Sequence, residues 1–367
     1  MKCFYSASES FQAFYHQLKK DYKVFIPVPK DSEGRERDYF YQISRQEAPF
    51  YFNAYRTVEP LKSFFTHCYE PVAEYFEQQF TPNNPISLGV AQQRTSIHPN
   101  SQTIVFGVKS CDLAGHKIQD YVFLEGVDVD AQYRLKREHT ILIAGDCTDF
   151  KEVCHCLAWE IQPYPDQGFD LCLALINDGY LVEVGSLKGE HLISRYNDYF
   201  SPAKDAHIAA RKMKRAQLVE RLKKHLLPQN LVAKESVQQL MKQGLHLDTW
   251  KQFMLTCVEC GGCNLICDTC HCFLLADQKA GAQHEKVRVW DSCLYANYAK
   301  VAGGANPLKL RAQRLRNRFI KKFDFFVDNL GMPACCGCGR CIEVCPGKID
   351  IREVLKDLRQ RLTAEAR

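Results

Sequence analysis

The sequence predicts an α+β protein with a mixed α/β domain at its N-terminus, a helical linker, and a C-terminal domain built on a cysteine repeat. Three observations predict this order: short β-branched runs before residue 202, leucines four residues apart after residue 203, and two copies of one cysteine pattern after residue 251. The chain has 367 residues, more than one hydrophobic core usually organises. We therefore expect domains at 1–202 and 251–367, joined by a linker at 203–250.

Short apolar runs in the N-terminal part predict buried strands. Two of them, TIVFGV (103–108) and TILIAG (140–145), are rich in β-branched residues, and a cysteine follows each one closely. The run LCLALI (171–176) is separated from YLVEVGS by an Asn-Asp-Gly sequence, which predicts a β-hairpin. The N-terminal domain should therefore be a mixed α/β structure with cysteines just beyond its strand ends.

The linker shows helical periodicity. Leu218, Leu222 and Leu226 recur every four residues among lysines and arginines, which is the pattern of an amphipathic helix. Pro228 should end this helix, because proline cannot continue the hydrogen-bond ladder. Residues 232–247 predict a second helix that leads into the cysteine-rich region.

Composition and charge exclude several classes of protein. The net charge of +5 is too small to argue for nucleic acid or an anionic membrane. The N-terminus lacks the basic head and apolar core of a secretory signal, and no apolar run approaches the ~20 residues of a transmembrane helix. We therefore expect a cytoplasmic protein that binds neither nucleic acid nor a membrane.

The nineteen cysteines are the most informative feature of the composition. Fourteen of them lie in three short windows, at 147–156, 257–272 and 335–345. Disulfides are typical of small secreted chains, whereas this chain is long and has an odd number of cysteines. Closely spaced thiolates on one loop can instead converge on a metal group. The sequence therefore predicts a reducing compartment and metal-bound thiolates.

Eight of these cysteines form an internal repeat. Both copies follow C-x2-C-x2-C-x3-C, the run of bacterial ferredoxins, in which the fourth cysteine binds the neighbouring cluster. This spacing predicts a ferredoxin-like domain with two [4Fe–4S] clusters and no catalytic residue of its own. We assign one cluster to Cys257, Cys260, Cys263 and Cys345. We assign the other to Cys335, Cys338, Cys341 and Cys267, which leaves Cys336 as a spare.

Two other metal chemistries compete with this assignment. Structural zinc sites favour two C-x2-C pairs far apart, whereas here four cysteines fall within eleven residues, twice. The run from Cys267 to His271 matches the C-x-x-C-H pattern for covalent haem. Haem is attached outside the cytoplasm, and Cys267 already belongs to the repeat. Both patterns are therefore weaker explanations than iron–sulfur clusters.

The remaining cysteines leave the number of clusters open. Strand ends that are neighbours in a sheet would bring one group of four together, so a third [4Fe–4S] cluster competes with the interpretation as buried apolar thiols. This group is Cys111, Cys147, Cys154 and Cys156. A second group could complete a site with one borrowed ligand, and spacing does not decide between the two groups. It consists of Cys270, Cys272 and Cys293.

Charged residues near the repeat suggest further hypotheses. Residues 309–322 carry seven basic side chains and no acidic one. They could form a solvated helix face, neutralise anionic clusters, or dock an acidic partner; nucleic-acid binding is weaker because no known binding module accompanies them. Asp268 stands where the second motif has Pro346, and its carboxylate would lower the potential of an adjacent cluster.

An ordered series of segments resembles a known family. It includes FGVKSCDLAG, DYVFLEG, YRLKREHTILIAGDCTD, GFDLCLALINDGYLVEVGS, VRVWDSCLYANYAKVAGGANP and the two ferredoxin motifs. The chain resembles the iron–sulfur β subunit of sulfhydrogenase-type, NAD(P)-linked [NiFe] hydrogenases, and it is similar also to the electron-transfer subunit of anaerobic sulfite reductase. The family has counterparts of all eight cysteines of the repeat and of both additional groups. Asp268, where the family usually has proline, departs from it.

The resemblance implies a cytoplasmic electron-transfer subunit. A flavin-containing NAD(P)H reductase subunit would exchange hydride, and this chain would relay single electrons to or from [NiFe] hydrogenase catalytic subunits. The chain itself shows no G-x-G-x-x-G motif and no Walker loop, so its electrons must come from a partner. Sulfite reductase is the alternative complex. A structural or sensory iron–sulfur protein is the alternative from another class.

Overall fold

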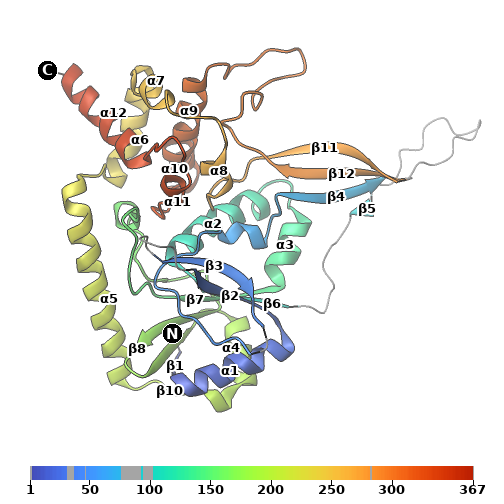
Figure 1. Cartoon of the computed structure of the whole chain (residues 1–367), viewed down its shortest axis with the longest axis vertical. Coiled ribbons are helices and arrows are strands. Elements are labelled where there is room, and N and C mark those ends of the chain that lie inside the picture. Colours follow the sequence, from blue (N-terminus) through green and yellow to red (C-terminus); the bar gives the residue numbers. More distant parts are fainter. Residues whose placement is uncertain are drawn as a thin grey trace, which may run out of the picture.

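The computed structural model describes residues 2–30, 37–45, 47–75, 92–93, 102–281 and 283–366. Its larger sheet has eight strands in the order β10-β1-β9-β8-β7-β6-β2-β3 (Figure 1). Neighbours within the block β2, β6, β7 and β8 are parallel, and the outer pairs are antiparallel. The strands are Cys3–Ala7 (β1), Lys23–Lys30 (β2), Asp38–Ile43 (β3), Thr103–Val108 (β6), Thr140–Gly145 (β7), Leu171–Ile176 (β8), Gly179–Val184 (β9) and Ser201–Pro202 (β10).

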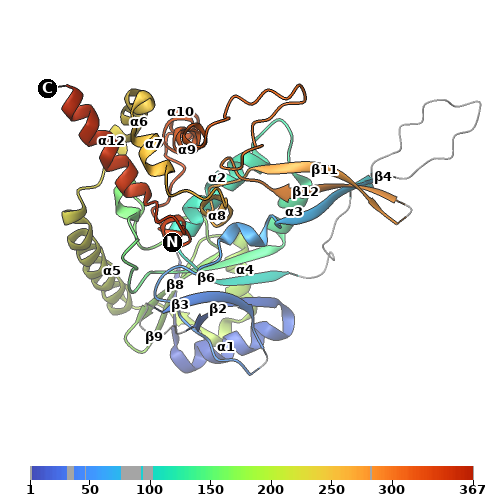
Figure 2. The ribbon, with the colours of Figure 1, turned by 45° about the horizontal axis from the view of Figure 1, so that its top comes forward.

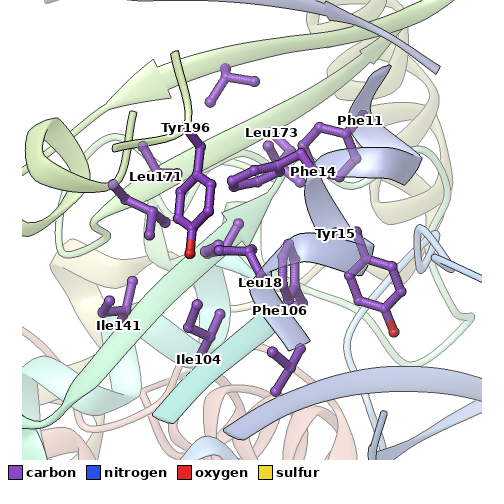
Figure 3. Packing of buried hydrophobic residues seen from close by; sticks show 14 of the residues in the cluster. Phe11, Phe14, Tyr15, Leu18, Ile104, Phe106, Ile141, Leu171, Leu173 and Tyr196 are labelled. Atoms are coloured by element: carbon purple, nitrogen blue, oxygen red, sulfur yellow. The ribbon is translucent and has the colours of Figure 1, made fainter. Parts of the chain in front are cut away.

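Helices cover both faces of this sheet, which confirms a mixed α/β N-terminal part. On one face, α1 (Ser8–Asp21) and α4 (Leu187–Arg195) pack aromatic and aliphatic side chains on the central strands (Figure 3). The other face is covered by α2 (Ser110–Leu124) and α3 (Ala131–Glu138). Strands buried on both faces need continuous apolar runs, and all six residues of β7 are buried. The predicted strands and the predicted β8–β9 hairpin are confirmed.

The linker and the C-terminal part are mainly helical. Helix α5 runs along one side of the molecule and contacts β8 and β9 (Figure 1). Helices α6 and α7 instead pack with α9 and α12 around a second core. The helices are Asp205–Leu226 (α5), Lys234–Gln243 (α6), Thr249–Met254 (α7), Arg311–Ile320 (α9), Phe326–Leu330 (α10) and Ile351–Glu365 (α12). Short turns are Leu61–Phe64 (η1), Cys156–Trp159 (η2), Asn197–Tyr199 (η3), Leu227–Gln229 (η4), Gly244–His246 (η5) and the π-helical Lys321–Phe325 (η6).

Both linker helices lie where the periodicity predicts them, and Pro228 falls in the turn that ends α5. The linker does not form a separate layer. Its first helix belongs to the α/β part, and its second belongs to the C-terminal core. The domain bounds at 202 and 250 stay a prediction.

A second, smaller sheet projects from the rest of the molecule (Figures 1 and 2). We call it the arm. Its order is β11-β12-β4-β5, so a hairpin of the C-terminal part pairs with strands of the N-terminal part. The arm strands are Tyr69–Tyr75 (β4), Gln92–Gln93 (β5), Phe273–Ala280 (β11) and Gln283–Trp290 (β12).

The two halves of the cysteine repeat lie together between the arm, the sheet and the C-terminal helices. Each half leads into a short helix, α8 (Gly262–Leu265) in the first and α11 (Arg340–Glu343) in the second. These two helices contact each other (Figure 1). Within the described part of the chain, no helix has the length and apolar character needed to cross a membrane.

Candidate cluster sites

The first site is a cavity that both halves of the repeat build. It is open to solvent, has a volume of about 530 Å³, and we call it the first cavity. Three cysteines of the first motif line it together with the last cysteine of the second motif. These are Cys257, Cys260, Cys263 and Cys345, the four side chains of the first predicted cluster.

The walls of the first cavity combine apolar side chains with one buried cation. Leu294, Leu315 and Phe319 line it beside Arg318. Burial raises the pKa of the Cys263 thiol, and the Arg318 guanidinium opposes this shift by favouring the thiolate. An apolar site with a fixed positive charge suits the binding of an anionic group.

The second set of cysteines lies directly beside the first cavity. Burial is the main cause that raises the pKa values of Cys335, Cys338 and Cys341, and a thiolate at Cys267 raises each of them further. The Lys322 ammonium contacts both Cys267 Sγ (3.4 Å) and the carbonyl oxygen of Ala334 (3.1 Å), so Cys267 lies beside the start of the second motif. We call these four cysteines the second cysteine set. Cys341 also lines the first cavity.

The basic stretch at 309–322 turns one face toward these cysteines. Arg314, Arg318 and Lys322 are spaced four residues apart along α9 and η6, and all three are buried. The Lys322 ammonium donates to Cys267 Sγ (3.4 Å) and to Thr269 Oγ1 (2.7 Å). The interpretation as a solvated helix face is therefore wrong for these three residues. It holds for Lys309 and Arg311, which are exposed.

The third site lies at the carboxyl ends of two parallel strands. Strands β6 and β7 are neighbours, so the loops that follow them meet at one edge of the sheet. A cavity of about 390 Å³, which we call the third cavity, opens there. Its lining includes the four cysteines of the possible third cluster, together with one residue of the second set. These are Cys111, Cys147, Cys154 and Cys156, with Cys338.

Buried cations also surround the third cavity. Arg56 lines it and donates from Nε to the carbonyl oxygen of Cys338 (2.9 Å). Lys109 is fully buried, and its ammonium donates to the carbonyl oxygen of Asp146 (2.9 Å). Burial raises the pKa of the Cys147 thiol to about 12, and Lys109 opposes this shift. The positive charge again favours thiolates.

Close packing connects the second motif to the loop of the third cavity. Gly337 has φ +63°, and a Cβ there would lie 2.5 Å from the Cα of Cys156. The carbonyl oxygen of Gly337 accepts a hydrogen bond from the backbone N–H of His155 (2.8 Å). Only glycine allows this approach without strain. The two cysteine loops therefore share one backbone contact.

Arg340 is the central charge of the region. It is 1% exposed and lies between the last two cysteines of the second set. Its Nη1 contacts a carboxylate oxygen of Asp112 at 2.7 Å and one of Asp268 at 2.8 Å. Asp112 follows Cys111, and Asp268 follows Cys267. One guanidinium thus joins three cysteine-bearing segments.

The pairing of Asp268 changes the hypothesis about its effect on potential. Its carboxylate is buried beside Arg340 and also accepts from the backbone N–H of Lys62 (3.0 Å). Burial raises the pKa of Asp268 to about 8, and Arg340 opposes this shift. The neighbouring cation offsets the negative charge, so the expected lowering of a cluster potential by Asp268 is smaller than for a free carboxylate. That effect stays a hypothesis.

The described residues contain no group of three His, Cys, Asp or Glu side chains that converges as a single metal ion would require. Thiolates of a multi-iron cluster lie farther apart than the four ligands of one zinc ion, each about 2.3 Å from the metal. The structure brings together the predicted first and third groups around cavities. It brings Cys267 beside the start of the second motif.

The sequence interpretation missed the buried cations outside 309–322. Arg340 lies inside the second motif and Lys109 lies two residues before Cys111, so their positions were a usable signal. Arg56 and Lys62 lie far from any cysteine motif in the sequence. Nothing in the pattern around them predicts a contact with the cysteine loops. Cys336, the predicted spare, is buried near Gly115.

Comparisons with known proteins identify the type of domain that carries the cysteine repeat. Residues 256–349 match the family model described as a 4Fe-4S dicluster domain. The chain is 28% identical to sulfhydrogenase 2 subunit beta of Pyrococcus furiosus over 97% of its own length and 98% of that protein's length. The resemblance to a sulfhydrogenase β subunit found in the sequence is thereby confirmed. The C-terminal part is an iron–sulfur domain of the [4Fe–4S] type.

Proposed function

We propose that this chain is the electron-transfer subunit of a cytoplasmic [NiFe] hydrogenase complex. It relays single electrons through [4Fe–4S] clusters, and it connects the catalytic subunits with a flavin-containing NAD(P)H reductase subunit. The similarity to a sulfhydrogenase β subunit covers nearly the whole of both chains and supports the type of complex. The 4Fe-4S dicluster domain supports the type of cofactor.

The observation that carries the relay is the composition of the first cavity. Cysteines 257, 260 and 263 line it with Cys345, which lies more than eighty residues further along the chain. This is the crossed sharing of ligands that brings two cubes close together in ferredoxins with two clusters. A structural site would need one cube, whereas neighbouring cubes favour electron exchange.

Shared lining residues suggest an order for the relay. Cys341 of the second set also lines the first cavity, and Cys338 of the same set lines the third cavity. The second set therefore lies between the other two sites. We propose three clusters in this order, held by Cys257, Cys260, Cys263 and Cys345, then by Cys267, Cys335, Cys338 and Cys341, then by Cys111, Cys147, Cys154 and Cys156.

Bound clusters would supply one-electron oxidation and reduction, and the protein's residues control charge and access. Arg318 and Lys322 stand beside the first cavity and the second set, while Arg56 and Lys109 stand beside the third cavity. Fixed positive charges stabilise the more negative, reduced state of a cluster and so raise its potential. Apolar walls reduce the access of water to the sites.

Iron analysis of paired variants tests the crossed ligands. In the crossed arrangement Cys257→Ala and Cys345→Ala remove the same cluster, so the double variant loses only about four iron atoms per chain. Cys335→Ala with Cys345→Ala removes both clusters of the repeat and loses about eight. Ligands confined to their own motif would reverse these two results. Cys336→Ala is the matched control and should keep its full iron content.

The partners are tested by co-purification and reduction. Protein isolated without oxygen, together with the products of neighbouring genes, should have its clusters reduced by hydrogen and by NAD(P)H. Reduction by NAD(P)H with reoxidation by sulfite, and no response to hydrogen, would assign the sulfite reductase alternative. Clusters that respond to no reductant would reject an electron relay.

A further inference from the structure

We propose that Cys270, Cys272 and Cys293 hold one further iron–sulfur cluster at the base of the arm. This site, which we call the hairpin site, adjoins the second set, because the Cys270 and Cys267 side chains are hydrogen-bonded to each other. The inference rests on the position of these three thiols and not on the identity of any partner protein.

The antiparallel hairpin of the arm brings the three cysteines together. Cys270 and Cys272 lie just before β11, and Cys293 lies just after β12. Phe273 at the start of β11 pairs with Trp290 at the end of β12. The backbone N–H of Asp291 donates to the carbonyl oxygen of Cys272 (2.9 Å). Residues more than twenty positions apart in sequence therefore meet at one end of the hairpin.

Asn264 holds two of the three thiols. Its Nδ2 donates to Cys293 Sγ (3.2 Å), and its Oδ1 accepts from Cys270 Sγ at 3.7 Å. The amide is itself fixed, because Arg318 Nε donates to the same Oδ1 (2.7 Å) and the side chain is 2% exposed. Such a fixed amide sets the separation of the two sulfurs.

Tyr298 connects the third thiol to the same site. Its hydroxyl lies 3.6 Å from Cys272 Sγ and accepts from the Lys321 ammonium (2.8 Å). All three thiols thus have polar neighbours that orient them.

A cavity and a buried cation mark the hairpin site as a place for an anionic group. Cys270 and Cys272 line the cavity with Lys62 and Trp290, and Asn264, which donates to Cys293, lines it too. The Lys62 ammonium lies 4.3 Å from the centre of the Trp290 ring. It donates to backbone carbonyl oxygens of Asn264 (3.2 Å) and Cys270 (3.0 Å) rather than to a carboxylate. Because no carboxylate in the described part of the chain accepts from Lys62, its positive charge can act on the group that the cysteines bind.

Three thiolates leave one iron of a [4Fe–4S] cluster for a ligand other than cysteine. His271 lines the same cavity, and its Nδ1 contacts the carbonyl oxygen of Thr269 (3.2 Å). A backbone carbonyl bonded to Nδ1 leaves Nε2 as the free nitrogen of a neutral imidazole, which is the usual arrangement for a histidine that binds metal. His271 is therefore the group that we assign to the fourth position.

Iron content of the wild-type chain is the first test. After anaerobic reconstitution with iron and sulfide, we expect about 16 iron atoms per chain, four for each of four clusters. A plateau at about 12 or fewer overturns the hairpin site if the triple variant described below has the same iron content as the wild-type chain.

Removal of the three thiols is the second test. The triple variant Cys270→Ala/Cys272→Ala/Cys293→Ala should lose about four iron atoms and one set of electron paramagnetic resonance signals. Cys68→Ala is the matched control, since Cys68 also lies at the base of the arm but is exposed. Unchanged iron in a folded triple variant, checked by circular dichroism, rejects the proposal.

A double variant separates this site from the ferredoxin repeat. If Cys270 were an alternative ligand of the cluster that Cys267 binds, Cys267→Ala with Cys270→Ala would lose only about four iron atoms. Two separate clusters predict a loss of about eight. Failure of the hairpin site would leave the losses in the Cys257 and Cys345 variants unchanged. The two proposals are thus tested independently.

Discussion

The first and third cavities hold similar sets of cysteines in opposite surroundings. At the first cavity Cys260 is exposed, and so are the neighbouring apolar side chains of Val258 and Val344. At the third cavity Cys154 and Cys156 are buried, and the cavity is formed where strand ends meet helical and loop segments. The cysteines alone do not separate the two sites. Their exposure predicts that a partner exchanges electrons more readily at the first cavity than at the third.

The largest expected effect comes from Arg340, which connects the third cavity to the second set. The variant Arg340→Met leaves Asp112 and Asp268 buried without their ion-pair partner, so we expect a loss of about 3–5 kcal/mol in stability. The shift of the denaturant midpoint, followed anaerobically by circular dichroism, measures it. Arg361→Met is the control, because Arg361 pairs with Asp357 on a half-buried helix face and should cost about 0.5 kcal/mol. Equal shifts would contradict the central role of Arg340.

Removal of metal should distinguish the two cavities directly. A chelator reaches a cluster on the partly exposed cysteines of the first cavity more easily than one on the cysteines of the third cavity, since Cys111, Cys154 and Cys156 are buried. We expect iron loss in two phases that differ in rate by about tenfold, equivalent to about 1.4 kcal/mol. Absorbance and iron released to a coloured chelator measure the phases. Loss of all the iron in a single phase would contradict a difference in access between the two cavities.

Arg318 should affect the first cavity and leave the third unchanged. Replacing it with glutamine removes a buried positive charge, so the reduced state of the nearby clusters becomes less stable. We expect a lower midpoint potential by on the order of 50 mV, since about 59 mV is a tenfold change for one electron. Arg316→Gln is the control on the same helix. Potentiometric titration should show no shift at the third cavity, and a uniform shift would contradict the local effect.

The smallest expected effect concerns partner docking at the first cavity. Val258→Ser removes an exposed apolar contact beside Cys257 and should slow electron transfer with the partner by about two- to fivefold, because most single contacts at the edge of an interface contribute less than about 1 kcal/mol. Iron content and potentials should not change. Val127→Ser, a fully exposed position after α2, is the control. If both variants exchange electrons with the partner at the same rate, the partner docks at a surface other than the first cavity.

Local patterns predicted much of the fold and the repeat. Strands β6 and β7 and the β8–β9 hairpin lie at the predicted residues because β-branched runs and turn residues act over short ranges. The same is true of α5 and α6. Helix α1 was not predicted, although Phe11, Phe14, Tyr15 and Leu18 have helical spacing. Its aromatic content is equally typical of strands.

Local sequence patterns could not predict contacts between segments that are far apart in the sequence. The pairing of Val289 with Tyr69 joins strands about 220 residues apart, and no periodicity encodes it. The same holds for the contact of Gly337 with Cys156 and for the placement of Arg56 beside Cys338. Cysteine spacing predicts which thiols act together on one loop. It does not predict which cations neutralise them.

The pairing of β4 with β12 has a consequence for how this module can be transferred between proteins. Arg288 on β12 is buried and forms ion pairs with Glu70 at the start of β4 and with Asp130 before α3. A gene fragment that encoded the cysteine repeat alone would leave one edge of the β11–β12 hairpin unpaired, which favours aggregation. It would also leave Arg288 buried without its carboxylate partners. A gene fusion that transfers the cysteine repeat to another protein would therefore also have to include β4.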